Sequence, residues 1–111
     1  MIESLFGNPV IEKILFYILM NEKTYASQLK QVFEVHLFSF QKALERLEKG
    51  GVIVSQMAGK TRLYQFNPRY PLLEELKLFL RKAYSFLPET LRLKYYESPI
   101  RKRPRRKGKP L

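Results

Sequence analysis

The side chains best suited to recognising another molecule lie in one helical segment near the middle of the chain. Between residues 37 and 49, apolar side chains recur at i, i+3, i+4 and i+7, and from residue 39 onward the other positions carry amide, hydroxyl or charged groups. Gln41 has the amide that pairs with adenine in the major groove of a duplex, and Lys42 suits guanine or a phosphate. Arg46, one turn further on, suits a phosphate, and Ser39 suits either partner. The alternative interpretation of Lys42 and Arg46 is an ordinary solvated helix surface.

A second cationic group surrounds a glycine in a predicted hairpin. Residues 52–56 are mostly β-branched and residues 61–66 alternate, so both segments predict strands, with a turn at residues 57–60. Lys60 and Arg62 follow Gly59 at the tip of this hairpin. A basic hairpin tip of this kind can lie on the phosphates or in the minor groove of a duplex. A solvated turn is the other interpretation.

The third cationic group is the C-terminal segment. Seven of the eleven net positive charges fall in residues 98–111, which leaves only four for residues 1–97. We therefore expect a folded domain at residues 1–97 and a basic, flexible tail at 98–111 that neutralises phosphates. Its predicted DNA-contacting residues are Arg101, Lys102, Arg103, Arg105, Arg106 and Lys107.

Several other kinds of chemistry are disfavoured by composition. There are no cysteines, and His36 is the single histidine, so a transition-metal site of the usual kind is not expected. No nucleophile elbow, phosphate-binding glycine loop or paired catalytic carboxylates stand out, so we expect neither an enzyme nor a cofactor. No apolar span approaches the roughly 18 residues of a membrane helix, and no signal peptide is evident. The sequence predicts a cytoplasmic protein.

The cationic segments must be positioned by a small helical core. A length of 111 residues suits one domain. Apolar periodicity, capping residues and glycine breaks predict helices at 9–21, 27–33, 37–49, 72–86 and 89–96, with the hairpin between the third and fourth. The expected fold class is therefore mainly α with a small β-hairpin. Leu37 and Phe38, which lie at the start of the third helix, are expected to pack under the wing. Contact with thymine methyl groups or with a partner protein are the other interpretations.

The helix at 72–86 carries more apolar residues than one small core needs. We expect one broad buried face, made of Leu72, Leu73, Leu76, Phe79, Leu80 and Ala83. Leu78, Tyr84 and Leu87 lie away from that face or at its edge. This excess predicts a homodimer through the helix, with the helix at 9–21 as a further contributor.

Residues 32–68, VFEVHLFSFQKALERLEKGGVIVSQMAGKTRLYQFNP, resemble the winged helix-turn-helix of bacterial and archaeal regulators of the arsenical-resistance-repressor type. ALERLEKGGVIV is similar to the recognition helix running into the first wing strand, and RLYQFNP to the second wing strand and its exit. The resemblance covers roughly residues 5–80. It implies a winged helix-turn-helix with an added C-terminal helix. The metal sensing of that family is not carried over, because the ligands are missing.

Two functions follow as hypotheses. The first is sequence-dependent binding of double-stranded DNA as a transcriptional regulator, with the third helix in the major groove and the wing on the backbone or minor groove. The second is a winged-helix module that binds protein, or RNA through its tail. A DNA reader should present a continuous positive surface across Lys42, Arg46, Lys60 and Arg62, whereas a protein-binding module should expose Leu37 and Phe38. A membrane role for the tail is disfavoured, because no amphipathic anchor adjoins it.

Overall fold

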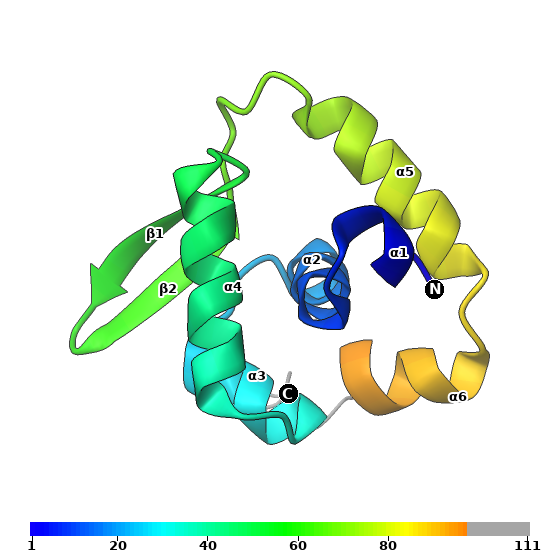
Figure 1. Ribbon diagram of the computed structural model, residues 1–111, viewed down its shortest axis with the longest axis horizontal. Coiled ribbons are helices and arrows are strands. Elements are labelled where there is room, and N and C mark those ends of the chain that lie inside the picture. Colours follow the sequence, from blue (N-terminus) through cyan, green and yellow to red (C-terminus); the bar gives the residue numbers. More distant parts are fainter. Residues whose placement is uncertain (98–111) are drawn as a thin grey trace, which may run out of the picture.

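The computed structural model describes residues 1–97 as a set of helices around one central helix, with a hairpin on one side (Figure 1). In chain order the elements are α1 (Glu3–Phe6), α2 (Pro9–Asn21), α3 (Ala26–Phe33), α4 (Leu37–Lys49), β1 (Ile53–Ala58), β2 (Thr61–Phe66), α5 (Leu73–Ser85), α6 (Glu89–Leu91) and the π-helical turn η1 (Arg92–Tyr96). The predicted fold class, mainly α with one hairpin, is confirmed. The short helix α1 was not predicted.

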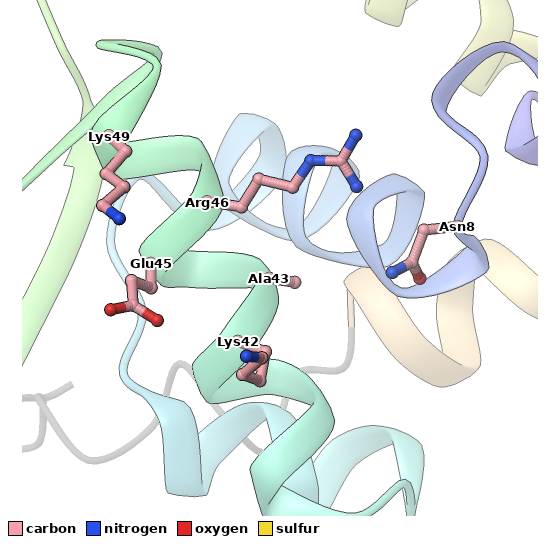
Figure 2. Close-up of a pocket in the computed structure, with 6 residues that line it drawn as sticks. All are labelled: Asn8, Lys42, Ala43, Glu45, Arg46 and Lys49. Carbon is pink, nitrogen blue, oxygen red and sulfur yellow. The ribbon is translucent and has the colours of Figure 1, made fainter.

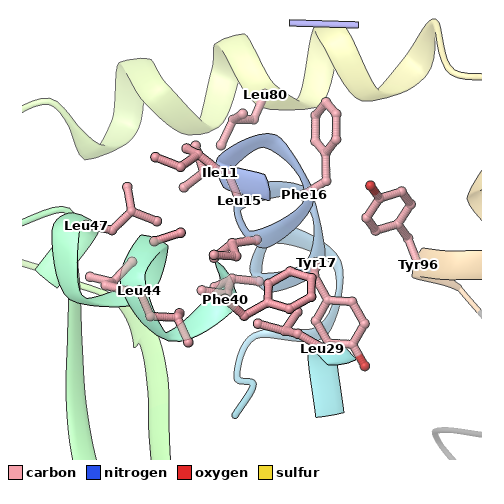
Figure 3. Close-up of a cluster of buried hydrophobic side chains, with 14 of the residues drawn as sticks. Ile11, Leu15, Phe16, Tyr17, Leu29, Phe40, Leu44, Leu47, Leu80 and Tyr96 are labelled. Carbon is pink, nitrogen blue, oxygen red and sulfur yellow. The ribbon is translucent and has the colours of Figure 1, made fainter. Parts of the chain in front are cut away.

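The central helix is α2, and it is buried on nearly every side. Its start follows the sequence signal, because the Asn8 side chain accepts a hydrogen bond from the Val10 amide at 2.8 Å and Pro9 occupies the first helical position. The five consecutive residues from 14 to 18 are all at most 2% exposed. Figure 3 shows α4 side chains on one side of α2 and Leu80 of α5 on another. Phe16 and Tyr17 are buried as well, because further neighbours surround α2, including Tyr84 and Tyr96 beside Phe16 and Phe33 beside Tyr17.

Aromatic rings connect the C-terminal turns to this core. The ring of Tyr96 lies 5.8 Å from that of Phe16 and 5.5 Å from that of Phe33, and Tyr84 lies 5.6 Å from both Phe16 and Tyr96. Edge-on arrangements at these separations are favourable for aromatic pairs. Burial, followed by the charge of Glu12, raises the pKa of Tyr96. The cluster explains why η1 packs against α2, a contact that the sequence did not predict.

The helix-turn-helix unit consists of α3 and α4. Between them the chain turns at Glu34, whose φ of 56° is left-handed, and at His36, which is exposed and precedes α4. The apolar stripe of α4 is buried as predicted, with Phe40 and Leu44 fully enclosed and Ala43 and Leu47 nearly so. That burial fixes which side of α4 remains available to a ligand.

The hairpin is longer and tighter than the sequence indicated. Its antiparallel register runs from Ile53 opposite Phe66 to Ala58 opposite Thr61, so only Gly59 and Lys60 form the connection. Gly59 has a φ of +66°, a conformation that suits glycine in a two-residue hairpin loop. In addition, the amides and carbonyls of Thr24 and Tyr64 exchange two hydrogen bonds, at 3.0 and 2.8 Å. This bridge fixes the base of the hairpin against the start of α3.

The predicted face of α5 needs three corrections. Leu72 and Phe79 were expected in the core but are 58% and 42% exposed, whereas Tyr84 was expected at an edge but is buried. The buried face of α5 is narrower than its number of apolar residues suggests. The reason is that no described element covers the side of α5 that faces away from α2 (Figure 1). Tyr84 is drawn inward by the aromatic cluster. Among residues 1–97 no helix has the length and apolar character needed to cross a membrane.

Candidate nucleic-acid interface

One face of α4 carries three cations. Lys42, Arg46 and Lys49 are spaced by four and three residues, so the helix brings them to one side, and all three are exposed. Figure 2 shows an open hollow between α4 and the N-terminal end of α2, with Arg46 extending toward α2. Its lining residues are Asn8, Lys42, Ala43, Glu45, Arg46 and Lys49. A phosphate there would meet cations and the positive end of the α2 dipole.

A second hollow lies between α4, the start of α3 and the hairpin. Three residues predicted to contact DNA, Gln41, Lys60 and Arg62, line it together. The other lining residues are Tyr25, Ala26, Ser27, Leu37, Thr61 and Tyr64. Ser27 and Thr61 were missed by sequence reasoning, although a serine in the first turn of α3 is a recognisable helix-start signal. The hollow thus offers hydroxyl, amide and cationic groups side by side.

Arg62 is held by its neighbours in the wing. Its guanidinium donates to the Ser55 hydroxyl at 3.0 Å, and that hydroxyl donates to the Glu48 carboxylate at 2.7 Å. The wing is thereby connected to the C-terminal half of α4. Burial, followed by the negative charge of Glu48, raises the pKa of Tyr64, so its phenol stays neutral beside Gln41 and can donate a hydrogen bond.

The structure does not bring Ser39 next to Gln41. Two residues along an α-helix correspond to a rotation of about 200°, so the two side chains leave α4 in nearly opposite directions. Ser39 is half-buried, and neither of the two hollows includes it. The α4 residues that were predicted to contact DNA are thus divided. Gln41 lies on the side of the wing, and Lys42 and Arg46 lie on the side toward α2.

The two apolar residues at the start of α4 differ. Leu37 is half-buried and lines the hollow beside the wing, which agrees with the expected packing. For Phe38 that expectation was wrong, because its side chain is 67% exposed. The Lys42 ammonium lies 5.7 Å from the centre of the Phe38 ring, within range of a cation–π contact. The N-terminal half of α4 therefore presents an aromatic ring and a cation together.

The predicted tail contacts lie outside the described residues. They are Arg101, Lys102, Arg103, Arg105, Arg106 and Lys107. Within residues 1–97, no group of three or more acidic or histidine side chains is arranged to hold a metal ion.

Comparison with known proteins gives similarity in structure alone. No family model matches this sequence, and no curated protein matches it. The YusO protein from Bacillus subtilis matches with a TM-score of 0.58 and 21% identity, over 83% of this chain and 73% of that one. A mutant of ZitR from Lactococcus lactis in its apo form matches with a TM-score of 0.52 and 16% identity, over 74% of this chain and 67% of that one. The described elements and these matches together show that the chain has the winged helix-turn-helix fold.

Proposed function

We propose that this protein is a DNA-binding transcriptional regulator of the cytoplasm and has no catalytic activity. In the proposed complex, α4 enters the major groove, and the wing lies on the phosphates or in the minor groove. The observation that carries the proposal is the distribution of charge. Five cations and two glutamates on α4 and the wing account for three of the four net positive charges of residues 1–97. Figure 1 shows α4 and the hairpin together on one side of α2.

The two hollows suggest separate roles along α4. Gln41, beside the wing, is placed for a base edge, and Lys42 and Arg46, toward α2, for phosphates. Phe38 projects from the same end of the helix and can contact a thymine methyl group. The predicted relationship to the arsenical-resistance-repressor type, and residues 98–111 as a phosphate-neutralising tail, belong to this proposal. We further propose that the protein binds as a homodimer on two half-sites about one helical turn apart.

Selection of bound sequences from a random duplex library is the first test, and we expect an enriched motif. The second is fluorescence anisotropy with Lys42→Ala combined with Arg46→Ala. Removing a phosphate contact should reduce the salt slope by about one, and removing a base contact should cost about 1–3 kcal/mol and relax sequence preference. Arg81→Ala combined with Lys94→Ala removes the same charge from α5 and η1, two elements that lie apart from α4 and the hairpin (Figure 1). Equal affinities for the two double variants would contradict this binding surface.

One observation favours a second candidate function, a protein-binding module. Phe38 is a large apolar side chain on α4 that is 67% exposed. With Leu37 at its side it offers an aromatic anchor of the kind found at protein interfaces. A flat result from the duplex selection, together with loss of a protein partner in Phe38→Ala, would favour this function. A regulator should instead show a selected motif that Lys42→Ala weakens.

A further inference from the structure

A third hollow lies between the end of α2, the second wing strand and α5. Its volume is about 380 Å³, which is within the range of small-molecule sites. The apolar residues that line it are Ile18, Leu19 and Phe66, and the cationic ones are Lys23, Lys77 and Arg81. These residues come from three segments that are far apart in the chain. A ligand in this hollow would therefore contact α2, the wing and α5 at the same time.

The three cations share the hollow with a single acidic residue. Lys77 and Arg81 are four residues apart on α5, so they leave the helix on the same side, and Lys23 joins them from the segment after α2. None of the three makes an ion pair with another of the described residues. Three cations less the carboxylate of Glu22 leave the hollow with a net charge of +2. Like charges gathered in one place repel each other, and a bound anion would remove that repulsion.

This hollow lies on the opposite face of the wing from the hollow that contains Gln41. Gln65 lines the former and Tyr64 lines the latter, and neighbouring residues of a strand point to opposite faces. The backbone bridge between Thr24 and Tyr64 connects the start of α3 to the same strand. The cations of the third hollow are therefore not part of the proposed DNA surface, and DNA binding does not account for their grouping.

The backbone beside Lys23 is strained. Glu22 has a φ of 72°, which residues with a side chain rarely adopt. The Lys23 amide donates to the Asn21 carbonyl at 2.8 Å, so Glu22 is at the centre of a γ-turn of the rare, strained kind. Strain of this kind is concentrated at binding sites, where the surrounding structure maintains it. Here it accompanies the sharp turn after α2 that places Lys23 at the hollow.

We propose that this hollow binds a small phosphate monoester and that the bound molecule connects the wing to α5. A phosphate monoester carries nearly two negative charges at neutral pH, which balances the net charge of the hollow. The Arg81 guanidinium suits two phosphate oxygens at once, and the lysine ammonium groups suit the third. The Gln65 amide can donate a further hydrogen bond. The Lys77 ammonium lies 5.8 Å from the centre of the Phe66 ring, so an apolar part of the ligand has an aromatic surface beside the cations.

Phenyl phosphate and phenyl sulfate are suitable probes, because they have nearly the same shape and differ by one negative charge. Titration calorimetry on the full chain without DNA, at about pH 8 so that the phosphate is doubly charged, should show phenyl phosphate binding about ten-fold more tightly than phenyl sulfate. Lys77→Ala combined with Arg81→Ala should weaken phenyl phosphate binding about ten-fold or more, because two charge-assisted contacts are lost. Arg81→Ala alone should weaken it in the same direction. Helical circular dichroism should be kept, because Lys77 is half-buried and Arg81 is exposed.

The matched control is Lys82→Ala combined with Lys94→Ala, which removes the same charge from exposed positions that do not line this hollow. It should bind phenyl phosphate as wild type does. Equal affinity for the two probes, equal losses in the two double variants, or no binding of phenyl phosphate to wild type would each overturn the site.

Hydrogen exchange tests the proposed connection between the wing and α5. Phenyl phosphate should slow exchange in both residues 61–66 and residues 73–85 of wild type, because the ligand contacts both segments. The Tyr64 amide, which donates to the Thr24 carbonyl at 2.8 Å, should be among the protected groups. The effect should be absent from the double variant in α5 and present in the control. Protection confined to residues 73–85 would overturn the connection to the wing. None of these measurements uses DNA, so their failure would leave the proposed regulator function untouched.

Discussion

Phe38 and Phe40 lie two residues apart on α4 and have opposite environments. Phe40 is fully buried on the inner side of α4, and the centre of its ring lies 6.0 Å from that of Phe33. Phe38 is 67% exposed and lies beside Lys42. The helical period alone separates them, because a two-residue step turns the side chain to the other side of the helix. Phe40 therefore contributes to stability, and Phe38 is available for binding.

The two phenylalanines give a paired prediction for stability. Phe40→Ala should lower the free energy of unfolding by about 3–5 kcal/mol, because it removes buried apolar surface and leaves a cavity. Phe38→Ala should change it by less than about 0.5 kcal/mol, as is usual for exposed positions. Urea denaturation followed by circular dichroism measures both. A large loss of stability in Phe38→Ala would show that this side chain packs in solution, as its apolar character alone predicts.

At the scale of elements, two adjacent glycines end α4 and have different roles. Gly50 has a helical φ of −77°, whereas Gly51 has a φ of +80°, which side chains with a Cβ rarely adopt. After this turn the Val52 amide donates to the Leu47 carbonyl at 3.0 Å, which satisfies one of the last helical carbonyls. The direction of the chain into β1, and hence the position of the wing, depends on Gly51.

Alanine at each glycine should therefore give different results. Gly51→Ala should destabilise the protein by about 1–2 kcal/mol, because alanine is strained at positive φ. Nothing lies within 4 Å of the added Cβ, so the cost comes from the backbone and not from a clash. Gly50→Ala should be neutral or stabilise by up to about 1 kcal/mol, since its Cβ would make an ordinary contact at 3.6 Å with the Arg46 carbonyl. Thermal unfolding of the two variants side by side decides this, and equal melting temperatures would contradict it.

At the scale of the whole molecule, charge and apolar surface are separated. The helix α4 and the wing, which carry five cations, lie on one side of α2, and α5, which has the exposed apolar residues Leu78 and Phe79, lies on another (Figure 1). This arrangement fits the proposed binding of DNA through one face and of a second copy through another. The remaining excess of charge lies in residues 98–111, which hold seven cations and no acidic residue.

Truncation after Pro99 tests the contribution of that excess. The melting temperature should stay nearly unchanged, because the removed residues 100–111 contain only two large apolar side chains, Ile100 and Leu111, among seven cations. Affinity for non-specific duplex should fall, and the slope of log affinity against log salt should flatten by about 0.9 for each phosphate that the shorter chain no longer neutralises. The ratio of specific to non-specific binding should be kept or improved. Titration of both proteins with duplex DNA at several salt concentrations provides the measurement. Equal slopes for the two proteins would show that these residues do not contact DNA and that their charge serves another partner.

The amino-acid sequence by itself determined the elements and their order. Helical periodicity in residues 37–49, the Asn8-Pro9 start of α2 and the glycines after α4 act between residues close in the chain, so they can be recognised without a tertiary structure. The bounds of α2, α4 and β2 match the prediction within a residue. The sequence also predicted that α4 and the wing act together, because a wing follows its recognition helix directly. It grouped Lys60 and Arg62 with Lys42 and Arg46, whereas in the structure they share a hollow with Gln41.

Only the tertiary structure decided which apolar surfaces are covered. Phe16 and Tyr17 are buried because α2 has neighbours on several sides, whereas Phe79 is exposed because α5 has neighbours on one side only. The sequence shows the same apolar residue types in both helices and does not state how many neighbours each helix has. Burial depends on contacts between segments far apart in the chain, such as that of Phe16 with Tyr96. Such contacts are fixed by the packing of the whole domain and not by local periodicity.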